Sequence, residues 1–498
     1  MAVQKKMASS KLLTKQSVPS SSFSRDAIAG LDKLRMPADG HKLDVRYARV
    51  PWQERYEIGK ALRAKTPRES HANKDSSALK RPDPLDLLDL SNRGRQEDLI
   101  PLRMGRMAAS PFAFLRGSAC VMAWDLSKTP SCGIRVIIDG DAHLNNFGMY
   151  GTPQRDVIFD LNDFDEASIG PWEWDLKRLV ASVNVAGRLN GLNVKDRADA
   201  VRQCVGGYRW NAERLASMGV LDTWYLHAYP TRTQAGFAVD PKSAAIFRRT
   251  AAKALLQTNA TLLTKIARRE VNGSWRFRET PPILTRVTDI TREKVIDGLN
   301  LYSKSLPAER AYMLGQYHVV DVAHRVVGIG SVGTRAYLAL LFGNSDADPL
   351  FLQVKEAVAP VYAPYVPPAP KGYEDNGKRV VTGQTALQAS SDVMLGHTVI
   401  DGRPYLVRQM KNMKASIETT ELIGRSFGVY SRACGALLAR AHARSGDASA
   451  IAGYCGRSAV LDDALAIWAE EYGNQTERDH ERLLKAIKSG RVQAIMGI

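Results

Sequence analysis

The sequence has little of what marks several large classes of protein. Its 498 residues include only five cysteines, with no C-x-x-C spacing, so we expect neither a disulfide framework nor a zinc site, and a reducing cytoplasm is favoured. No apolar run approaches the roughly 20 residues of a membrane-spanning helix, so no membrane association is expected. Residues 1–24 are rich in serine and lysine without an apolar stretch, which argues against a secretory signal.

Acidic residues are outnumbered by basic ones, but the excess is dispersed. Lysine and arginine total 69 against 52 aspartate and glutamate, a net charge of +17. No block of five basic residues, zinc-finger spacing or RNA-binding motif accompanies this charge. We therefore expect attraction for small polyanions such as nucleotides, and no specific nucleic-acid partner.

Apolar periodicity divides the chain into parts of different character and predicts an α+β protein. The expected parts are a disordered basic tail (1–40), a segment that wraps onto the main body (41–100), a mostly helical part that contains two short strands (101–310), a sheet-rich part (311–415) and C-terminal helices (416–498). The stretch 190–310 has no recognisable motif and is the expected place for acceptor specificity. The sequence does not predict an oligomeric state.

A polar loop and an acidic block follow two short apolar strands. The loop is 140–146 (GDAHLNN), and the block is 162–166 (NDFDE). Phosphoryl transfer requires a carboxylate that orients the attacking hydroxyl, together with carboxylate and amide oxygens that hold Mg²⁺. The candidate catalytic residues are accordingly Asp141 and His143, and the candidate metal ligands are Asn146 and Asp163.

Other interpretations of these residues stay open. Gly, Asp and Asn are common in turns, so the loop alone is a weak signal. Asp160 is a rival to Asp163 as the metal ligand, and His143 could serve only as a structural hydrogen-bonding group. Asp175, at the start of the next helix, is expected to cap or hydrogen-bond the loop.

A second group of candidate residues lies far downstream, at 328–355. The glycines of 328–333 (GIGSVG) join two expected strands, an arrangement that lets backbone N–H groups approach phosphates. A Rossmann loop would open a helix instead. The strand 351–355 (FLQVK) matches the V-A-I-K strand whose lysine pairs with phosphates, although a lysine at a strand end is otherwise a surface charge. The candidate nucleotide-binding residues are Gly328, Gly330, Ser331, Gly333 and Lys355, with Gln409 and Met410 as a hinge that could bind adenine.

Two further features concern charged side chains. The helix after Lys355 offers Gln384 and Gln388 where a glutamate would normally hold the lysine, and the nearby acids are Glu374, Asp375 and Asp392. Three arginines precede the loop: Arg103, Arg106 and Arg116. We expect them to form surface ion pairs, with binding of a phosphate or acidic substrate as the alternative.

These motifs resemble those of aminoglycoside phosphotransferases and related small-molecule kinases, which carry an H-G-D-x-H-x-x-N loop, an acidic block and a G-x-P-x-x-D-L-A segment. Asp139 stands where that family usually has histidine. Because the loop precedes the glycine-rich segment, and 434–443 resembles the helix that leads into the loop, the resemblance implies a circularly permuted, bilobal protein-kinase-like fold, with a largely helical C-lobe and a small antiparallel-sheet N-lobe. It also implies an ATP- and Mg²⁺-dependent phosphotransferase acting on a hydroxyl of an unidentified, small-molecule acceptor. Nucleotidyl (AMP) transfer and nucleotide binding without catalysis are the alternatives.

From about residue 40 to its end, the chain is similar to a bacterial family of unknown function, DUF2252. The similarity is carried by 101–107, 110–117, 140–148, 159–166 and 170–178. The family name implies no substrate.

Overall fold

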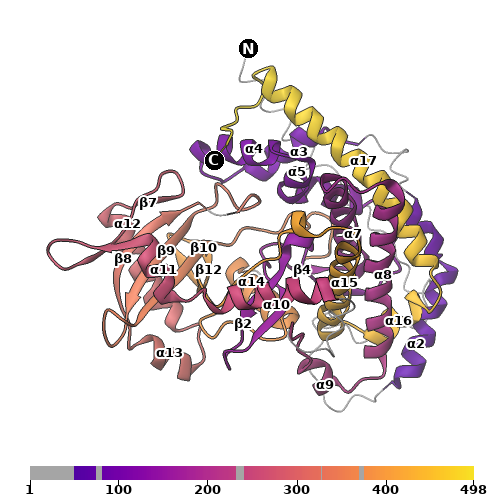
Figure 1. Cartoon of the computed structure of the whole chain (residues 1–498), viewed down its shortest axis with the longest axis horizontal. Helices are drawn as coiled ribbons and strands as arrows, with labels where there is room; N and C mark the ends of the chain where they lie inside the picture. The colour runs from indigo at the N-terminus through magenta and orange to yellow at the C-terminus, as the bar shows by residue number, and fades with distance from the viewer. Residues whose placement is uncertain (1–49, 74–80, 231–240, 327, 369–374, 498) are drawn as a thin grey trace.

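A six-stranded antiparallel sheet and a group of long helices make up the computed structural model (Figure 1). It describes residues 50–73, 81–230, 241–326, 328–368 and 375–497, so the expected tail at 1–40 lies outside the described residues. The predicted α+β class is confirmed. No helix in the described ranges is both long enough and apolar enough to cross a membrane.

The main sheet has the strand order β11-β12-β10-β9-β8-β7. Its strands are β7 (Leu284–Arg286), β8 (His318–Arg325), β9 (Ala336–Phe342), β10 (Pro349–Glu356), β11 (Gly396–Ile400) and β12 (Arg403–Gln409). The hairpin predicted at Asp401-Gly402 is confirmed, since both residues have positive φ, 50° and 71°, in the two-residue turn between β11 and β12. The strand β10 is buried along its whole length, as expected for the inner strand that carries Lys355.

Helices cover both faces of this sheet. On one face, α12 (Asp289–Ser303) and α13 (Ala308–Leu314) pack apolar side chains against the strands. On the other, Leu262 and Leu263 of α11 (Asn259–Ile266) cover Phe351 and its neighbours. Alternation along β10 puts Lys355 on the same face as Phe351, at the opposite end of the strand. This end of the sheet faces the helical part of the molecule.

The helical part is built around α7 (Trp172–Leu189), α8 (Val194–Ala216), α15 (Arg425–Ser445), α16 (Ala448–Cys455) and α17 (Val460–Lys488). Here α8 and α15 approach each other closely. A Cβ atom at Gly435 would lie only 2.0 Å from the carbonyl oxygen of Cys204, so this contact requires glycine. The helix α14 (Asn376–Leu387) lies between the two parts and contacts β11, β12 and α15. It ends at Leu387, and the following residue, Gln388, has an extended backbone (ψ 142°).

Two small two-stranded sheets position the polar loop and the acidic block. The strand β1 (Arg135–Ile138) pairs with β4 (Ser168–Pro171), and β2 (Phe147–Gly151) pairs with β3 (Val157–Leu161). The loop 139–146 follows β1 and the block 162–166 follows β3, as the sequence predicted, whereas β2, between the loop and β3, was not predicted.

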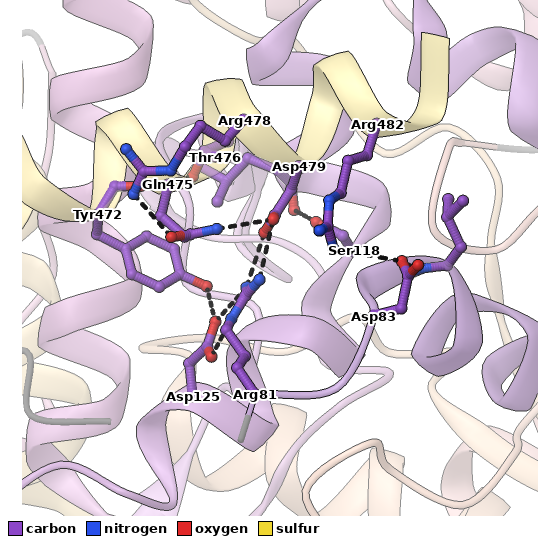
Figure 2. A network of polar contacts seen from close by, with 12 residues as sticks. Arg81, Asp83, Ser118, Asp125, Tyr472, Gln475, Thr476, Arg478, Asp479 and Arg482 are labelled. Carbon is purple, nitrogen blue, oxygen red and sulfur yellow. Dashed lines mark hydrogen bonds and ion pairs between the residues drawn. The ribbon is translucent and has the colours of Figure 1, made fainter. Parts of the chain in front are cut away.

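The N-terminal segment contacts helices from the other end of the chain. It comprises α2 (Trp52–Ala61), α3 (Pro84–Asn92), α4 (Ile100–Ala108), α5 (Pro111–Gly117) and α6 (Ala119–Leu126). Arg55 forms an ion pair of 2.8 Å with Asp447. Figure 2 shows Arg81 between Asp125 and Asp479, with N–O distances of 2.7–2.9 Å to both oxygens of each carboxylate. Charge-assisted bidentate pairs of this kind fix geometry strongly.

The remaining elements are short or peripheral. They are α9 (Val220–Trp224), α10 (Pro241–Leu255), β5 (Ala267–Arg269), β6 (Trp275–Phe277) and 3₁₀ turns at Leu62–Ala64, Arg68–Ala72, Glu97–Leu99, Leu144–Asn146 and Thr419–Glu421. Although β7 and α12 precede residue 311, both belong to the sheet part.

Candidate active site

A cavity of about 90 Å³ lies between the polar loop and the glycine-rich turn. Among the residues that line it are seven of those predicted from the sequence: Asp141, His143, Asn146, Asp163, Gly328, Gly330 and Ser331. The other lining residues are Arg95, Arg116, Asp165, Glu166, Ile329, Thr334, Glu356 and Val358. Segments far apart in the chain therefore meet at one site.

Lys355 is joined to this cavity through Asp165. Its Nζ forms an ion pair with Asp165 Oδ2, and Ser331 Oγ donates a hydrogen bond of 3.2 Å to the same oxygen. The lysine is only 4% exposed, so it is not a surface charge. Burial lowers the pKa of Lys355, but the carboxylates of Asp163 and Asp165 raise it more, and the net change is upward. The ion pair joins the sheet part to the acidic block.

Asp141 is held in place from two sides. The Arg178 guanidinium, on α7, donates bonds of 2.9 and 2.6 Å to Asp141 Oδ1, while Oδ2 lies 3.6 Å from His143 Nε2. Burial raises the pKa of Asp141 to about 7, although Arg178 lowers it. Burial also lowers the pKa of His143, helped by the charge of Arg116, so the imidazole is neutral at pH 7. A carboxyl group with a pKa near 7 suits general-base catalysis.

The side chain of Asp175 fixes the backbone of the polar loop. Asp175 accepts hydrogen bonds from the N–H groups of Asp139 (2.6 Å) and Gly140 (2.9 Å), which confirms that prediction. His442 of α15 lies 3.1 Å from the same carboxylate. Gly140 has φ 79°, and a Cβ atom there would lie 2.4 Å from the carbonyl oxygen of Glu166. The loop therefore needs glycine both for its conformation and for its contact with the acidic block.

The two rival metal ligands lie in different surroundings. Asp160 is buried away from the cavity: its Oδ1 forms an ion pair of 2.5 Å with Arg440, and its Oδ2 accepts from the Ala389 N–H at 2.8 Å. Asp163 lines the cavity, and its Oδ1 is buried without a hydrogen-bond partner among the described residues. A buried carboxylate oxygen with no donor fits a cation better than one already bonded. The geometry therefore favours Asp163.

The oxygen ligands available suit Mg²⁺ that arrives with a phosphate group. In the described ranges, no group of three or more His, Cys, Asp and Glu side chains could hold a metal ion. Asp163 and Asn146 bring one carboxylate and one amide to the cavity. Because Mg²⁺ is usually bound by one or two carboxylates together with waters and substrate phosphates, these two side chains fit such an ion.

Besides Lys355, three predicted nucleotide-binding residues do not line the cavity. The carbonyl oxygen of Gly333 accepts from the Gln96 N–H at 2.7 Å. Gln409 donates its backbone N–H and its Nε2 to Asp392, at 2.6 and 2.5 Å. The Met410 N–H donates to the carbonyl oxygen of Phe351 at 2.8 Å. The backbone N–H groups of this expected hinge are thus already bonded within the protein.

The partner of Lys355 is none of the acids near α14 in the sequence. Asp375 instead caps α14 by accepting from the Lys378 N–H at 2.6 Å, Asp392 bonds to Gln409, and Glu374 lies outside the described residues. The helix contributes a cation, because Arg379 donates to the carbonyl oxygens of Asp165 and Val358 at 2.9 and 2.8 Å. This helix therefore holds the backbone of the acidic block, which itself supplies the partner of the lysine.

Among the described residues, Arg103 and Arg116 do not form the surface ion pairs that we expected. Arg103 is 2% exposed and donates to Asn92 Oδ1 (2.5 Å) and to the Gly117 carbonyl oxygen (2.8 Å). Arg106 donates to the Gly328 carbonyl oxygen at 2.6 Å, and Arg116 lines the cavity. Sequence reasoning missed Arg95, which donates to the Val332 carbonyl oxygen at 2.6 Å and so supports the glycine-rich turn. No local sequence signal marks that contact.

Comparison with known proteins identifies the family. A family model described as "Uncharacterized protein conserved in bacteria (DUF2252)" matches residues 95–486. The chain therefore belongs to this family, which confirms the similarity seen in its motifs. No curated protein and no solved structure matches the chain.

Proposed function

We propose that the protein is an ATP- and Mg²⁺-dependent phosphotransferase that acts on a hydroxyl of a small molecule. The observation that carries this proposal is the ion pair between Lys355 and Asp165, 190 positions apart in the chain, at a cavity that also contains Asp141, Asn146 and Asp163. A lysine for phosphates, oxygen ligands for a metal and a carboxylate for the hydroxyl are the parts that kinase chemistry needs.

Topology supports the permuted kinase-like arrangement inferred from the motifs. The glycine-rich turn joins β8 to β9, and Lys355 lies on the next strand, β10. A helix, α14, then precedes the last two strands of the sheet. The final residue of α15, Ser445, hydrogen-bonds the Ile137 N–H of β1 at 3.2 Å. The end of α15 thus lies where a helix leading into the 139–146 loop would end in an unpermuted chain.

The candidate site residues then have the following chemical roles. Asp141 accepts the proton of the acceptor hydroxyl as that oxygen bonds to the γ-phosphorus, and the bond from phosphorus to the bridging oxygen breaks with its electron pair left on ADP. Arg178 holds Asp141 in position. Asn146 and Asp163 would hold Mg²⁺, which when bound neutralises charge on the β- and γ-phosphates. Lys355 and the N–H groups of the glycine-rich turn bind phosphate oxygens.

The size of the cavity implies a movement. Ligand pockets usually measure roughly 300–1,000 Å³, whereas this cavity measures about 90 Å³. It can hold a phosphate group with its metal ion but not a whole nucleotide. We expect the glycine-rich turn to separate from the acidic block when ATP enters, with loss of the bond between Ser331 and Asp165.

One observation favours AMP transfer as a second candidate. The sheet face beyond Lys355, next to Met410 of the hinge where adenine was expected, is covered by Leu262 and Leu263 of α11. Closer to the lysine, Arg408 Nε donates to Gln353 Oε1 at 3.3 Å on the same face. If the base binds elsewhere, ATP could lie reversed, with its α-phosphate at the acceptor.

Labelled ATP distinguishes these functions. The full chain is incubated with Mg²⁺, a bacterial metabolite extract and ATP labelled at the α- or γ-phosphate, beside Asp141→Asn. Phosphoryl transfer predicts γ-labelled product, lowered about 10³-fold or more in the variant. An α-labelled product indicates AMP transfer. ATP binding that is lost in Lys355→Met, without any labelled product, indicates a non-catalytic nucleotide-binding protein. Absence of ATP binding would overturn all three.

A further inference from the structure

A second, larger cavity adjoins the first. Its volume is about 440 Å³, and Arg116, Gly328 and Ile329 line both cavities. This volume lies within the range of small-molecule sites. The two cavities share the glycine-rich turn, so a molecule in the second would lie beside the phosphate-binding residues of the first.

Arg116, which lines both cavities, has a guanidinium group that is partly removed from water. Arg116 Nε is buried and has no hydrogen-bond partner among the described residues. Burial lowers the pKa of Arg116, against the opposing charges of Asp141, Glu418 and Asp163. Its neighbour Arg178 is bound to Asp141 by two hydrogen bonds. Desolvation of a charged group is costly unless an opposite charge compensates it, and an anionic ligand would supply that charge at Arg116.

The other walls of the second cavity are small and mostly apolar. Ala109, just after α4, and Ala113 of α5 leave space that longer side chains would fill. Gly105 of α4 instead lets the helix approach the backbone of Ile495, whose carbonyl oxygen would lie 1.8 Å from a Cβ atom at this position. Ile329 adds an apolar contact from the glycine-rich turn. Arg106, on the same side as Gly105, is bonded to the Gly328 carbonyl oxygen at 2.6 Å and so connects α4 to the turn. The lining therefore offers an apolar surface with a cationic end at Arg116.

We propose that this second cavity binds the acceptor, a small molecule with an apolar body and a carboxylate or phosphate close to its reacting hydroxyl. The anionic group contacts Arg116, and the apolar body lies on Ala109, Ala113 and Ile329. The hydroxyl then points into the first cavity, towards Asp141. The inference rests on the proposed function, and it places acceptor recognition on α4 and α5 instead of the stretch 190–310.

Binding of simple probes tests the site without any turnover. The dissociation constants of phenyl phosphate, benzoate and benzyl alcohol are measured by calorimetry or ligand-observed NMR. The variant Ala109→Trp fills the cavity from an exposed position, and Ala252→Trp is the matched control on α10, also exposed and away from the lining. We expect at least one anionic probe to bind the wild type and Ala252→Trp with the same dissociation constant. For Ala109→Trp, the dissociation constant of that probe should be about tenfold higher or more.

The charge of Arg116 is tested separately. In Arg116→Gln the anionic probes should lose about tenfold in affinity, towards the weak binding of benzyl alcohol. The proposal is overturned if neither anionic probe binds the wild type, if Ala109→Trp binds them as the wild type does, or if adenosine is the ligand that Ala109→Trp excludes. If the variants weaken probe binding as expected but nothing is transferred from ATP, only the phosphotransfer proposal is overturned. If transfer from ATP occurs but Ala109→Trp binds the probes as the wild type does, only the acceptor-site proposal is overturned.

Discussion

Two clusters of charged side chains differ in how completely their atoms are bonded. Around Arg81, both oxygens of Asp125 and Asp479 accept from the guanidinium, and Tyr472 and Gln475 add bonds of 3.0 and 2.8 Å (Figure 2). In the first cavity, Asp163 Oδ1, His143 Nδ1 and Arg116 Nε are buried with no partner in the described structure. Buried polar atoms in native proteins are nearly always bonded, and three of the atoms without a partner in the described structure belong to residues that line this one cavity. We therefore expect the bonded cluster to hold the fold and the unbonded atoms of the cavity to be those that a ligand would contact.

The strongest test of this contrast is Asp163→Asn. If Asp163 binds the metal, turnover of Mg²⁺–ATP should fall by about 10³-fold. The free energy of unfolding without ligand should change by no more than about 1 kcal/mol, because Asp165 still pairs with Lys355. Kinetic assays and urea unfolding measure the two effects. A large loss of stability with activity retained would show that Asp163 is structural.

The Arg81 cluster should respond in the opposite way. In Arg81→Ala, Asp125 and Asp479, 12% and 4% exposed, lose their cation. The free energy of unfolding should fall by about 3–5 kcal/mol, while the folded fraction keeps wild-type affinity for Mg²⁺–ATP. Arg482→Ala is the control, since that side chain is 59% exposed and 3.9 Å from Asp83, and should cost less than about 0.5 kcal/mol. Urea denaturation that finds the two variants alike would contradict the assignment.

The pH dependence of kcat/KM tests Asp141. Burial raises its pKa to about 7, and only the ionised form can accept a proton. The rate should therefore be constant above pH 7 and fall about tenfold per pH unit well below it. A profile that stays flat down to pH 5 would show that another group is the base, or that chemistry does not limit the rate.

Lys177 is a buried, unbonded group that lies outside both cavities. Its Nζ has no hydrogen-bond partner in the described structure. Burial lowers the pKa of Lys177 to about 7, although Glu173 raises it, whereas an unfolded lysine has a pKa of about 10.4. Between these values the unfolded chain binds more protons, so the free energy of unfolding should rise with pH. We expect a rise of about 1–3 kcal/mol between pH 7 and 9 from this residue. Lys177→Met should remove that part, and an unchanged pH dependence in urea unfolding of the variant would exclude it.

The sequence could predict those features that residues close together in the chain determine. The strand before the 139–146 loop, the Asp401-Gly402 hairpin and the bonds from Asp175 to the loop follow from local patterns and spacing. Seven of the predicted site residues line one cavity: local motifs identify them, but packing between segments far apart in the chain brings them together.

The contacts that sequence reasoning missed depend on packing between distant segments. The sequence suggested acids near α14 as partners of Lys355, but the pairing with Asp165 depends on how the sheet lies against the acidic block. The charge of Arg116 reaches the cavity because α5 packs on α7. The bonded hinge, Gln409 and Met410, likewise depends on Asp392 and on the neighbouring strand β10.

The contacts between α15 and the polar loop have a consequence for folding during synthesis of the chain. Besides His442 at Asp175 and Arg440 at Asp160, Tyr430 of α15 donates to the Leu144 carbonyl oxygen at 2.9 Å across 286 positions. At roughly 5–20 residues per second, the ribosome needs about 15–60 s between making the loop and making the helix that supports it. A nascent or truncated chain thus carries Asp141 without the contacts that order its loop, and the loop gains them only when the last helices have folded.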